Sequence, residues 1–145
     1  GGFASETHIS DFDQHGTTVD SEEFTVAGDE PREMLGERTG PNAVELLLAA
    51  LGSCLSVTYA GHAAASGVEL TDLSFEFEGE LDLRGFLGLS DDVRPGYDEI
   101  EVTTHVESDA SDAELEALHE EVTETSSVYD NLTNGVDLNF DLQFD

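Results

Sequence analysis

Residues 43–66 read AVELLLAALGSCLSVTYAGHAAAS, and this stretch decides the fold. Within it Glu45 is the only carboxylate and His62 the only basic side chain. Mostly apolar residues with helical spacing form a stripe at positions 44, 47, 48, 51, 55, 58 and 62. Because Leu, Val and Ala fill the other faces, the pattern predicts a helix surrounded by protein on all sides. Asn42 is the predicted N-cap, and Gly67 is predicted to end the helix.

Small residues recur along this helix, which predicts that another helix can approach it closely. One chain of 145 residues has few elements with which to cover it. A second copy would supply an identical helix, so we expect an obligate homodimer. The uncharged part, residues 46–61, is shorter than the roughly 20 residues that span a bilayer, so we expect no membrane partner.

The segments before the helix predict a hairpin and a loop. β-prone runs at 3–9 and 23–27 flank a polar stretch with turn residues around Asp13 and Gly16. Glycine and proline recur at 28–42, which is therefore predicted to be a loop that leads into the helix.

Two segments after the helix alternate apolar and polar residues and predict one hairpin. They are 70–83, with Leu73, Phe75 and Phe77 facing inward, and 99–107, with Ile100, Val102, Thr104 and Val106 facing inward. Their connection, 84–98, is too long for a tight turn and exposes Phe86, Leu87 and Leu89. It is either a functional loop or one that a partner covers.

The last third of the chain predicts two helices and a strand. Ser108 or Ser111 caps a helix that continues to about Glu124, and a fresh cap at Ser126 begins a short helix. Residues 136–144 alternate and predict a final strand. This order of elements indicates an α+β fold.

Composition restricts the partners. The length fits a single domain, residues 1–145, with 34 Asp and Glu against four Arg, no Lys and a net charge of −30. Four scattered Arg cannot form a phosphate-binding surface, so we expect no nucleic acid partner. Evenly spread carboxylates suit molar salt and predict the cytosol of a salt-in halophile, such as a halophilic archaeon. An acidic decoy of DNA is the alternative, although a decoy concentrates its charge on one face.

Cys54 is the single cysteine, which excludes an intrachain disulfide and predicts a reducing, cytoplasmic compartment. A lone cysteine in an apolar helix is most often an inert core residue. The histidines outside the helix share no metal-ligand spacing, and we expect neither a metal site nor a cofactor. They are His8, His15, His105 and His119.

Residues 40–54, GPNAVELLLAALGSC, strongly resemble the signature helix of the OsmC/Ohr family of organic hydroperoxide reductases. The likeness covers roughly 28–143, with further matching segments at 58–62, 79–86, 93–97 and 127–134. The resemblance implies an intertwined homodimer in which two long central helices cross, with active sites at the subunit interface.

The resemblance also implies roles for single residues. In the peroxidases of this family a cysteine attacks the peroxide, an Arg stabilises its thiolate, a Glu orients the Arg, and a second cysteine resolves the sulfenic acid. Cys54 matches the attacking position, and Arg38 is the predicted counterpart of the Arg. The other two positions are filled by Val44, with Glu45 next to it, and by Ser126 or Ser127, and we expect these residues to line the substrate pocket.

A peroxidase needs Cys54 as a thiolate. A free thiol is mostly protonated at neutral pH, and burial among Leu and Ala raises its pKa further. Cys54 lies too far from the start of its own helix for the helix dipole to stabilise a thiolate. We therefore expect an Arg delivered by a loop to activate it.

Other candidates have simpler interpretations. His62 is about 12 Å along the helix from Cys54, too far for a direct pair, and we interpret it as a helix-end histidine with satisfied hydrogen bonds. Tyr129 either serves the short helix or lines the pocket.

Two functions follow. The first is a thiol-dependent reductase of small organic hydroperoxides, which needs an external thiol because the chain has one cysteine. The alternative is a non-catalytic dimer whose interface pocket binds a small apolar ligand.

Overall fold

The computed structural model describes residues 4–9, 12–14, 16–19 and 23–144. Phe3 of the first predicted strand and His15 lie outside these residues. The chain divides into two compact units, residues 1–50 and 51–145, and the division falls within the long helix.

Residues 1–50 contain the predicted hairpin. Strand β1 (Ser5–Ile9) pairs antiparallel with β4 (Phe24–Gly28), so Ser5 lies opposite Gly28. The predicted polar turn itself contains two short paired strands, β2 (Phe12–Gln14) and β3 (Thr17–Val19). Gly16 lies between them with a φ of 76°, a left-handed conformation that glycine adopts without strain, and this makes the tight turn possible.

The predicted loop contains one turn of 3-10 helix, η1 (Arg32–Met34), and leads into helix α1 (Ala43–Ser66). The Asn42 side chain accepts a hydrogen bond from the Glu45 N–H at 2.9 Å, and the Glu45 carboxylate accepts one from the Asn42 N–H at 2.8 Å. Gly67 follows the helix with a φ of 76°. Both predicted boundaries of α1 are confirmed, because reciprocal capping begins the helix and a left-handed glycine ends it.

One stripe of α1 is buried, made up of Leu51, Leu55, Tyr59 and Ala63. The predicted stripe was right at its centre but wrong at its end, where Tyr59 and Ala63 are buried in place of positions 58 and 62. The prediction of burial on all sides is not met within this chain, since Val57 is 72% exposed. Helix α1 is long and apolar enough to cross a membrane, but the core helices of soluble proteins meet the same criterion. In this structure 17% of its most apolar 18-residue window is buried.

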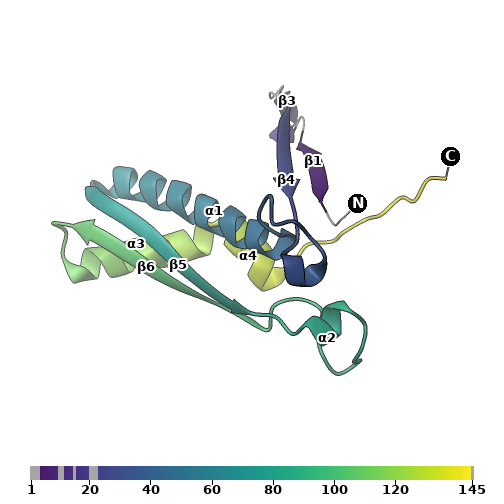
Figure 1. Ribbon diagram of the computed structural model, residues 1–145. Helices are drawn as coiled ribbons and strands as arrows, with labels where there is room; N and C mark the ends of the chain where they lie inside the picture. The colour runs from purple at the N-terminus through teal and green to yellow at the C-terminus, as the bar shows by residue number, and fades with distance from the viewer. Residues whose placement is uncertain (1–3, 10–11, 15, 20–22, 145) are drawn as a thin grey trace. The chain divides into compact units, whose positions relative to one another are not determined.

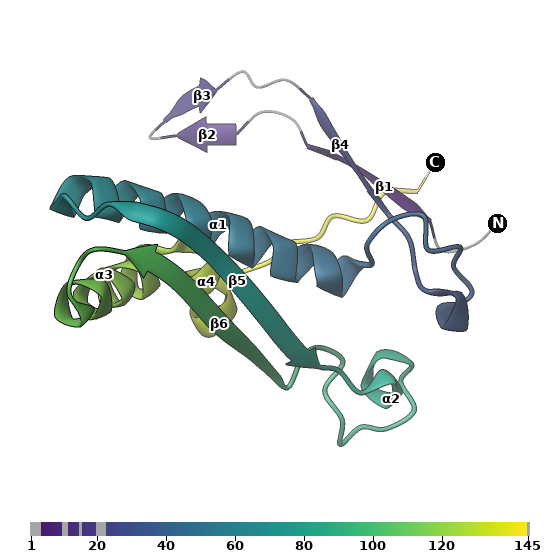
Figure 2. The same ribbon diagram turned by 60° about the vertical axis from the view of Figure 1, so that its left-hand side comes forward.

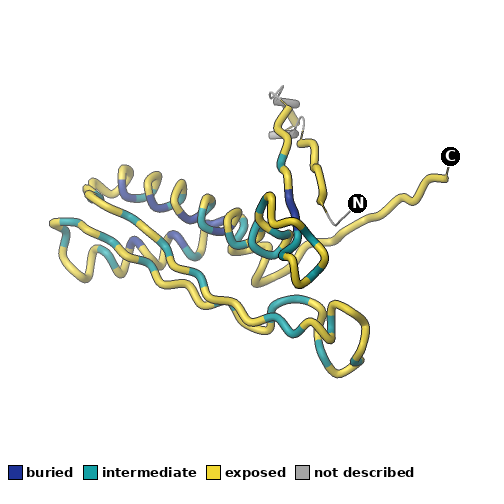
Figure 3. Tube along the Cα trace, in the orientation of Figure 1, coloured by how far each residue is buried: buried dark blue, intermediate teal, exposed yellow. Residues whose placement is uncertain are grey.

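Residues 51–145 form one hydrophobic core. Strands β5 (Leu70–Glu80) and β6 (Glu99–Ser108) pair antiparallel, as predicted. Helix α3 (Asp112–Thr125) begins with a capping box at Ser111 and lies with α1 along one face of this hairpin (Figures 1 and 2). Buried residues gather between the two helices, where Leu118 and Val122 of α3 meet the α1 stripe (Figure 3).

The connection between β5 and β6 contains a short helix, α2 (Leu83–Phe86), where a loop was predicted. Asp82 caps it by accepting a hydrogen bond from the Arg84 N–H. Phe86, Leu87 and Leu89 are exposed, as expected.

Helix α4 (Ser127–Asn134) follows α3 directly, and Gly135 ends it. The prediction of a strand at 136–144 is wrong, because this segment forms no strand and is exposed throughout, with Phe140 at 92%. Alternation predicts a strand that has one buried face, and within the described residues no sheet edge pairs with this segment.

Candidate active site around Cys54

The sulfur of Cys54 faces the junction between α3 and α4. Its Sγ lies 3.3 Å from the Ser126 Oγ, and the backbone N–H of Val128 donates a hydrogen bond to Sγ at 3.5 Å. Ser126 is fully buried, and Cys54 is half-buried. A thiolate sulfur can only accept hydrogen bonds, so both groups donate to Cys54 in its ionised form.

These contacts decide the pKa of Cys54. Burial is the largest single cause and raises the pKa. The Ser126 hydroxyl and the Val128 N–H oppose it, and the hydrogen bonds together hold the pKa of Cys54 below the ordinary value of a thiol. Donors at the start of α4 thus contribute to lowering the pKa of Cys54.

The position of Val128 explains its role. It is the second residue of α4, so its N–H has no acceptor inside the helix and is free to bond the sulfur. The positive partial charge at the start of a helix also favours an anion there. Sequence reasoning missed Val128 because a backbone N–H leaves no side-chain signal.

A second cluster lies within residues 1–50 and contains Arg38 and Glu45. The Arg38 guanidinium donates two hydrogen bonds to the Glu45 carboxylate, at 2.7 and 2.8 Å. The Arg38 side chain is the largest cause that lowers the pKa of Glu45, and Glu45 raises the pKa of Arg38 in turn. This forked geometry fixes the guanidinium in one orientation.

Asp29 organises the loop that carries Arg38. Its buried carboxylate accepts hydrogen bonds from the N–H groups of Glu30, Glu37 and Thr39 and from the Thr39 hydroxyl, at 2.9 to 3.0 Å. The Thr39 N–H is the largest cause that lowers the pKa of Asp29. These bonds hold a loop in which Arg38 adopts a φ of 58°, a conformation that is rare outside glycine.

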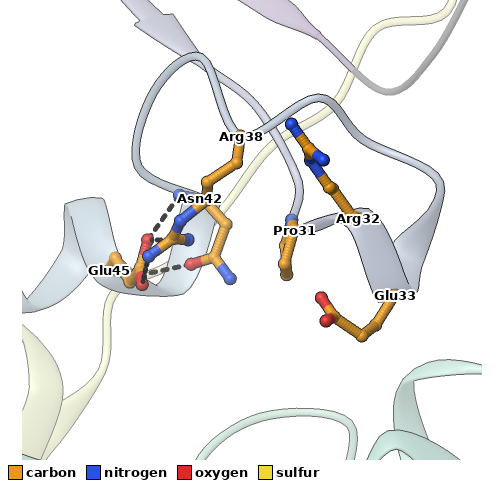
Figure 4. Close-up of a pocket in the computed structure, with 6 residues that line it drawn as sticks. All are labelled: Pro31, Arg32, Glu33, Arg38, Asn42 and Glu45. Atoms are coloured by element: carbon orange, nitrogen blue, oxygen red, sulfur yellow. Dashed lines mark hydrogen bonds and ion pairs between the residues drawn. The ribbon is translucent and has the colours of Figure 1, made fainter.

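A surface hollow of about 450 Å³ lies beside the ion pair (Figure 4). Figure 4 shows Arg38, Asn42 and Glu45 on one side of it and the η1 segment on the other. The lining residues are Pro31, Arg32, Glu33, Arg38, Asn42 and Glu45.

The structure therefore brings two pairs of predicted site residues together, Cys54 with Ser126 and Arg38 with Glu45. Val44 is half-buried in the first turn of α1, and the side chains of Ser127 and Tyr129 are exposed on α4. Among the described residues, no group of three His, Cys, Asp or Glu could hold a metal ion.

A long helix packed on an antiparallel hairpin, with a cysteine hydrogen-bonded to the start of another helix, defines an α+β protein. A family model described as OsmC-like protein matches residues 36–141, and the chain belongs to this family. The matched range includes parts of both compact units. No curated protein matches the chain.

Solved structures agree with the family fold. An OsmC-like protein from Mycoplasma pneumoniae is 18% identical with a TM-score of 0.67, over 90% of this chain and 87% of that one. An OsmC-like hydroperoxide resistance protein from Jannaschia sp. is 19% identical with a TM-score of 0.57, over 85% and 76%. An organic hydroperoxide resistance protein OsmC from Legionella pneumophila is 19% identical with a TM-score of 0.56, over 93% and 92%.

Proposed function

We propose that this protein is a thiol-dependent reductase of small organic hydroperoxides, with Cys54 as the attacking thiolate. The observation that carries the proposal is the pair of donors on Sγ, the Ser126 hydroxyl and the Val128 N–H, which lower the pKa of a cysteine on the central helix. Two similar OsmC structures belong to proteins described as hydroperoxide resistance proteins, which supports the substrate class.

The proposed cycle uses one cysteine. The Cys54 thiolate attacks the peroxide, the O–O bond breaks, and Cys54 becomes a sulfenic acid while the alcohol leaves after protonation. A small external thiol then forms a mixed disulfide with release of water, and a second thiol restores Cys54. Arg38 remains our proposal for a group that steadies the thiolate, and it rests on the family resemblance.

Intact-mass measurement tests the cycle. Stoichiometric cumene hydroperoxide should add one oxygen per chain, and a small thiol should then convert this species to a mixed disulfide. Cys54→Ser should give neither product. A folded wild-type chain that stays unmodified at excess peroxide would contradict the proposal.

The alternative function is binding of a small apolar ligand without catalysis. It is favoured by the missing second cysteine and by a hollow of about 430 Å³ within residues 51–145. The hollow is lined largely by apolar residues, among them Ala60, Ala64, Val68 and Leu73. Alkylation of Cys54 by iodoacetamide distinguishes the two functions. A cysteine that is not alkylated until the chain is denatured favours the ligand-binding function.

We also propose that residues 1–145 act as one domain in a homodimer. The exposed apolar side chains of α1, of 83–89 and of 136–144 support it, since a stable monomer rarely leaves so many uncovered. Light scattering in high salt should give twice the 15.6 kDa of one chain, and a mass of one chain would contradict the dimer.

The net charge of −30 supports a cytoplasmic protein adapted to molar salt. Self-repulsion destabilises the compact state unless salt screens it, so the Tm should rise steeply between dilute buffer and molar KCl. A Tm that does not change with KCl would argue against halophilic adaptation.

A further inference from the structure

His62 contacts the last turn of α3, two turns of α1 beyond Cys54. Its Nε2 lies 2.8 Å from the Thr125 Oγ1, and its Nδ1 lies 3.2 Å from the Glu121 carboxylate. Thr125 directly precedes Ser126, whose hydroxyl contacts the sulfur. Helix α1 therefore contacts the α3–α4 junction at two points, through the sulfur of Cys54 and through the imidazole of His62.

Each ring nitrogen of His62 has a partner on α3. Nε2 contacts the Thr125 hydroxyl, which also donates to the Glu121 carbonyl at 2.7 Å. Nδ1 contacts the Glu121 carboxylate. The two contacts fix the imidazole ring between α1 and the end of α3.

We propose that His62 is a positioning residue for Cys54. Through its contact with Thr125, His62 fixes the position at which Ser126 and the start of α4 contact the sulfur. This inference rests on the proposed function. Ser126 has little freedom of its own, since it is fully buried and its N–H donates to the Val122 carbonyl at 2.9 Å. The position of its hydroxyl is therefore set by the position of the α3–α4 junction. His62 is a side chain of α1 that contacts this junction at Thr125, away from the sulfur.

Four variants test the inference through the pH profile of Cys54 alkylation by iodoacetamide. His62→Gln and Thr125→Val should shift the profile to higher pH, because a displaced junction weakens the donors on Sγ. At neutral pH the rate should fall about fivefold, less than the loss of a whole hydrogen bond to a charged group would cause. Thr125→Ser keeps the hydroxyl and should restore the profile.

His119→Gln is the matched control. The His119 ring bonds the Tyr59 hydroxyl, so it also joins α3 to α1, but it does not contact Thr125 or Ser126. This variant should lower the Tm and leave the alkylation profile unchanged. If His62→Gln leaves the profile at wild type, or if both histidine variants shift it equally, His62 is merely structural and the inference fails.

The alkylation measurement is made without peroxide. A wild-type chain that never reduces peroxide would therefore overturn the proposed function while the profile still reports on His62.

Discussion

Ser126 is the residue whose side chain lies next to the sulfur of Cys54, with Oγ 3.3 Å from Sγ. The family resemblance places the second cysteine at Ser126 or Ser127, and a serine hydroxyl at either position cannot resolve a sulfenic acid. Cys54 and Ser126 are 72 positions apart. The sequence indicated both residues through the family resemblance, but the contact between them depends on how α3 ends and α4 begins, which no local pattern reveals.

Ser126→Ala should make Cys54 less reactive. Without the Ser126 hydroxyl, one of the hydrogen bonds that oppose the effect of burial is lost. The pKa of Cys54 therefore rises, and the thiolate fraction at neutral pH falls. Hydrogen bonds to charged groups are worth about 1.5–3 kcal/mol, so the iodoacetamide rate at neutral pH should drop about tenfold or more. Ser127→Ala removes an exposed hydroxyl and is the control, and an equal drop in both variants would contradict the role of Ser126.

Ser126→Cys should convert the proposed one-cysteine cycle into a two-cysteine cycle. The 3.3 Å between Sγ and Oγ places a second sulfur close enough to attack a sulfenic acid at Cys54, with release of water. One equivalent of hydroperoxide should therefore leave each chain lighter by two hydrogens instead of heavier by one oxygen. Ser127→Cys, whose side chain is exposed, should keep the added oxygen. Oxygen retained in Ser126→Cys would refute the prediction.

At the scale of elements, the sequence predicted what local chemistry determines. The bounds of α1 follow from Asn42 and Gly67, and the β5–β6 hairpin follows from its alternation. Residues 136–144 alternate equally well and form no strand, because a strand also needs a paired edge. The buried stripe of α1 was displaced towards Tyr59 because α3 and the hairpin, rather than the helix itself, select the face that is covered.

Asn42→Ala should destabilise α1. The Asn42 side chain satisfies the Glu45 N–H at the start of the helix, and loss of such a cap costs about 1 kcal/mol of the free energy of unfolding. Urea unfolding in molar KCl measures it. Asn42→Ser keeps an acceptor and should recover most of the loss, whereas equal stability of all three chains would show that the cap contributes nothing.

At the scale of the whole molecule, paired carboxylates determine stability at low pH. The folded chain lowers the pKa of Asp29, Glu45, Asp82 and Glu114, and the value for Asp82 falls to about 2 because of the Arg84 side chain. A lowered pKa means that the folded state favours the ionised form. Its contribution is complete above the ordinary carboxyl values near pH 4 and is lost as pH falls through the folded values.

The free energy of unfolding should therefore decrease as pH is lowered from about 4 towards about 2. Molar KCl must be present throughout, because protonation also relieves the repulsion of a −30 chain and would otherwise act in the opposite direction. Urea unfolding at a series of pH values measures the trend. Asp82→Asn should remove the part of the decrease that occurs at the low end of this pH range, where Asp82 becomes protonated. A stability that stays level or rises across this window would count against these carboxylate contacts.

The hydroxyl of Ser126 has a second possible use. Ser126 occupies the N-cap position of α4, yet its side chain makes no capping bond there, because it contacts the sulfur instead. We expect alkylation of the sulfur to release that hydroxyl to cap the helix, so amide hydrogen exchange in the first turn of α4 should report the chemical state of Cys54. Thermodynamic reciprocity then requires that anything which changes the fraying of α4 also changes the affinity of the sulfur for its proton.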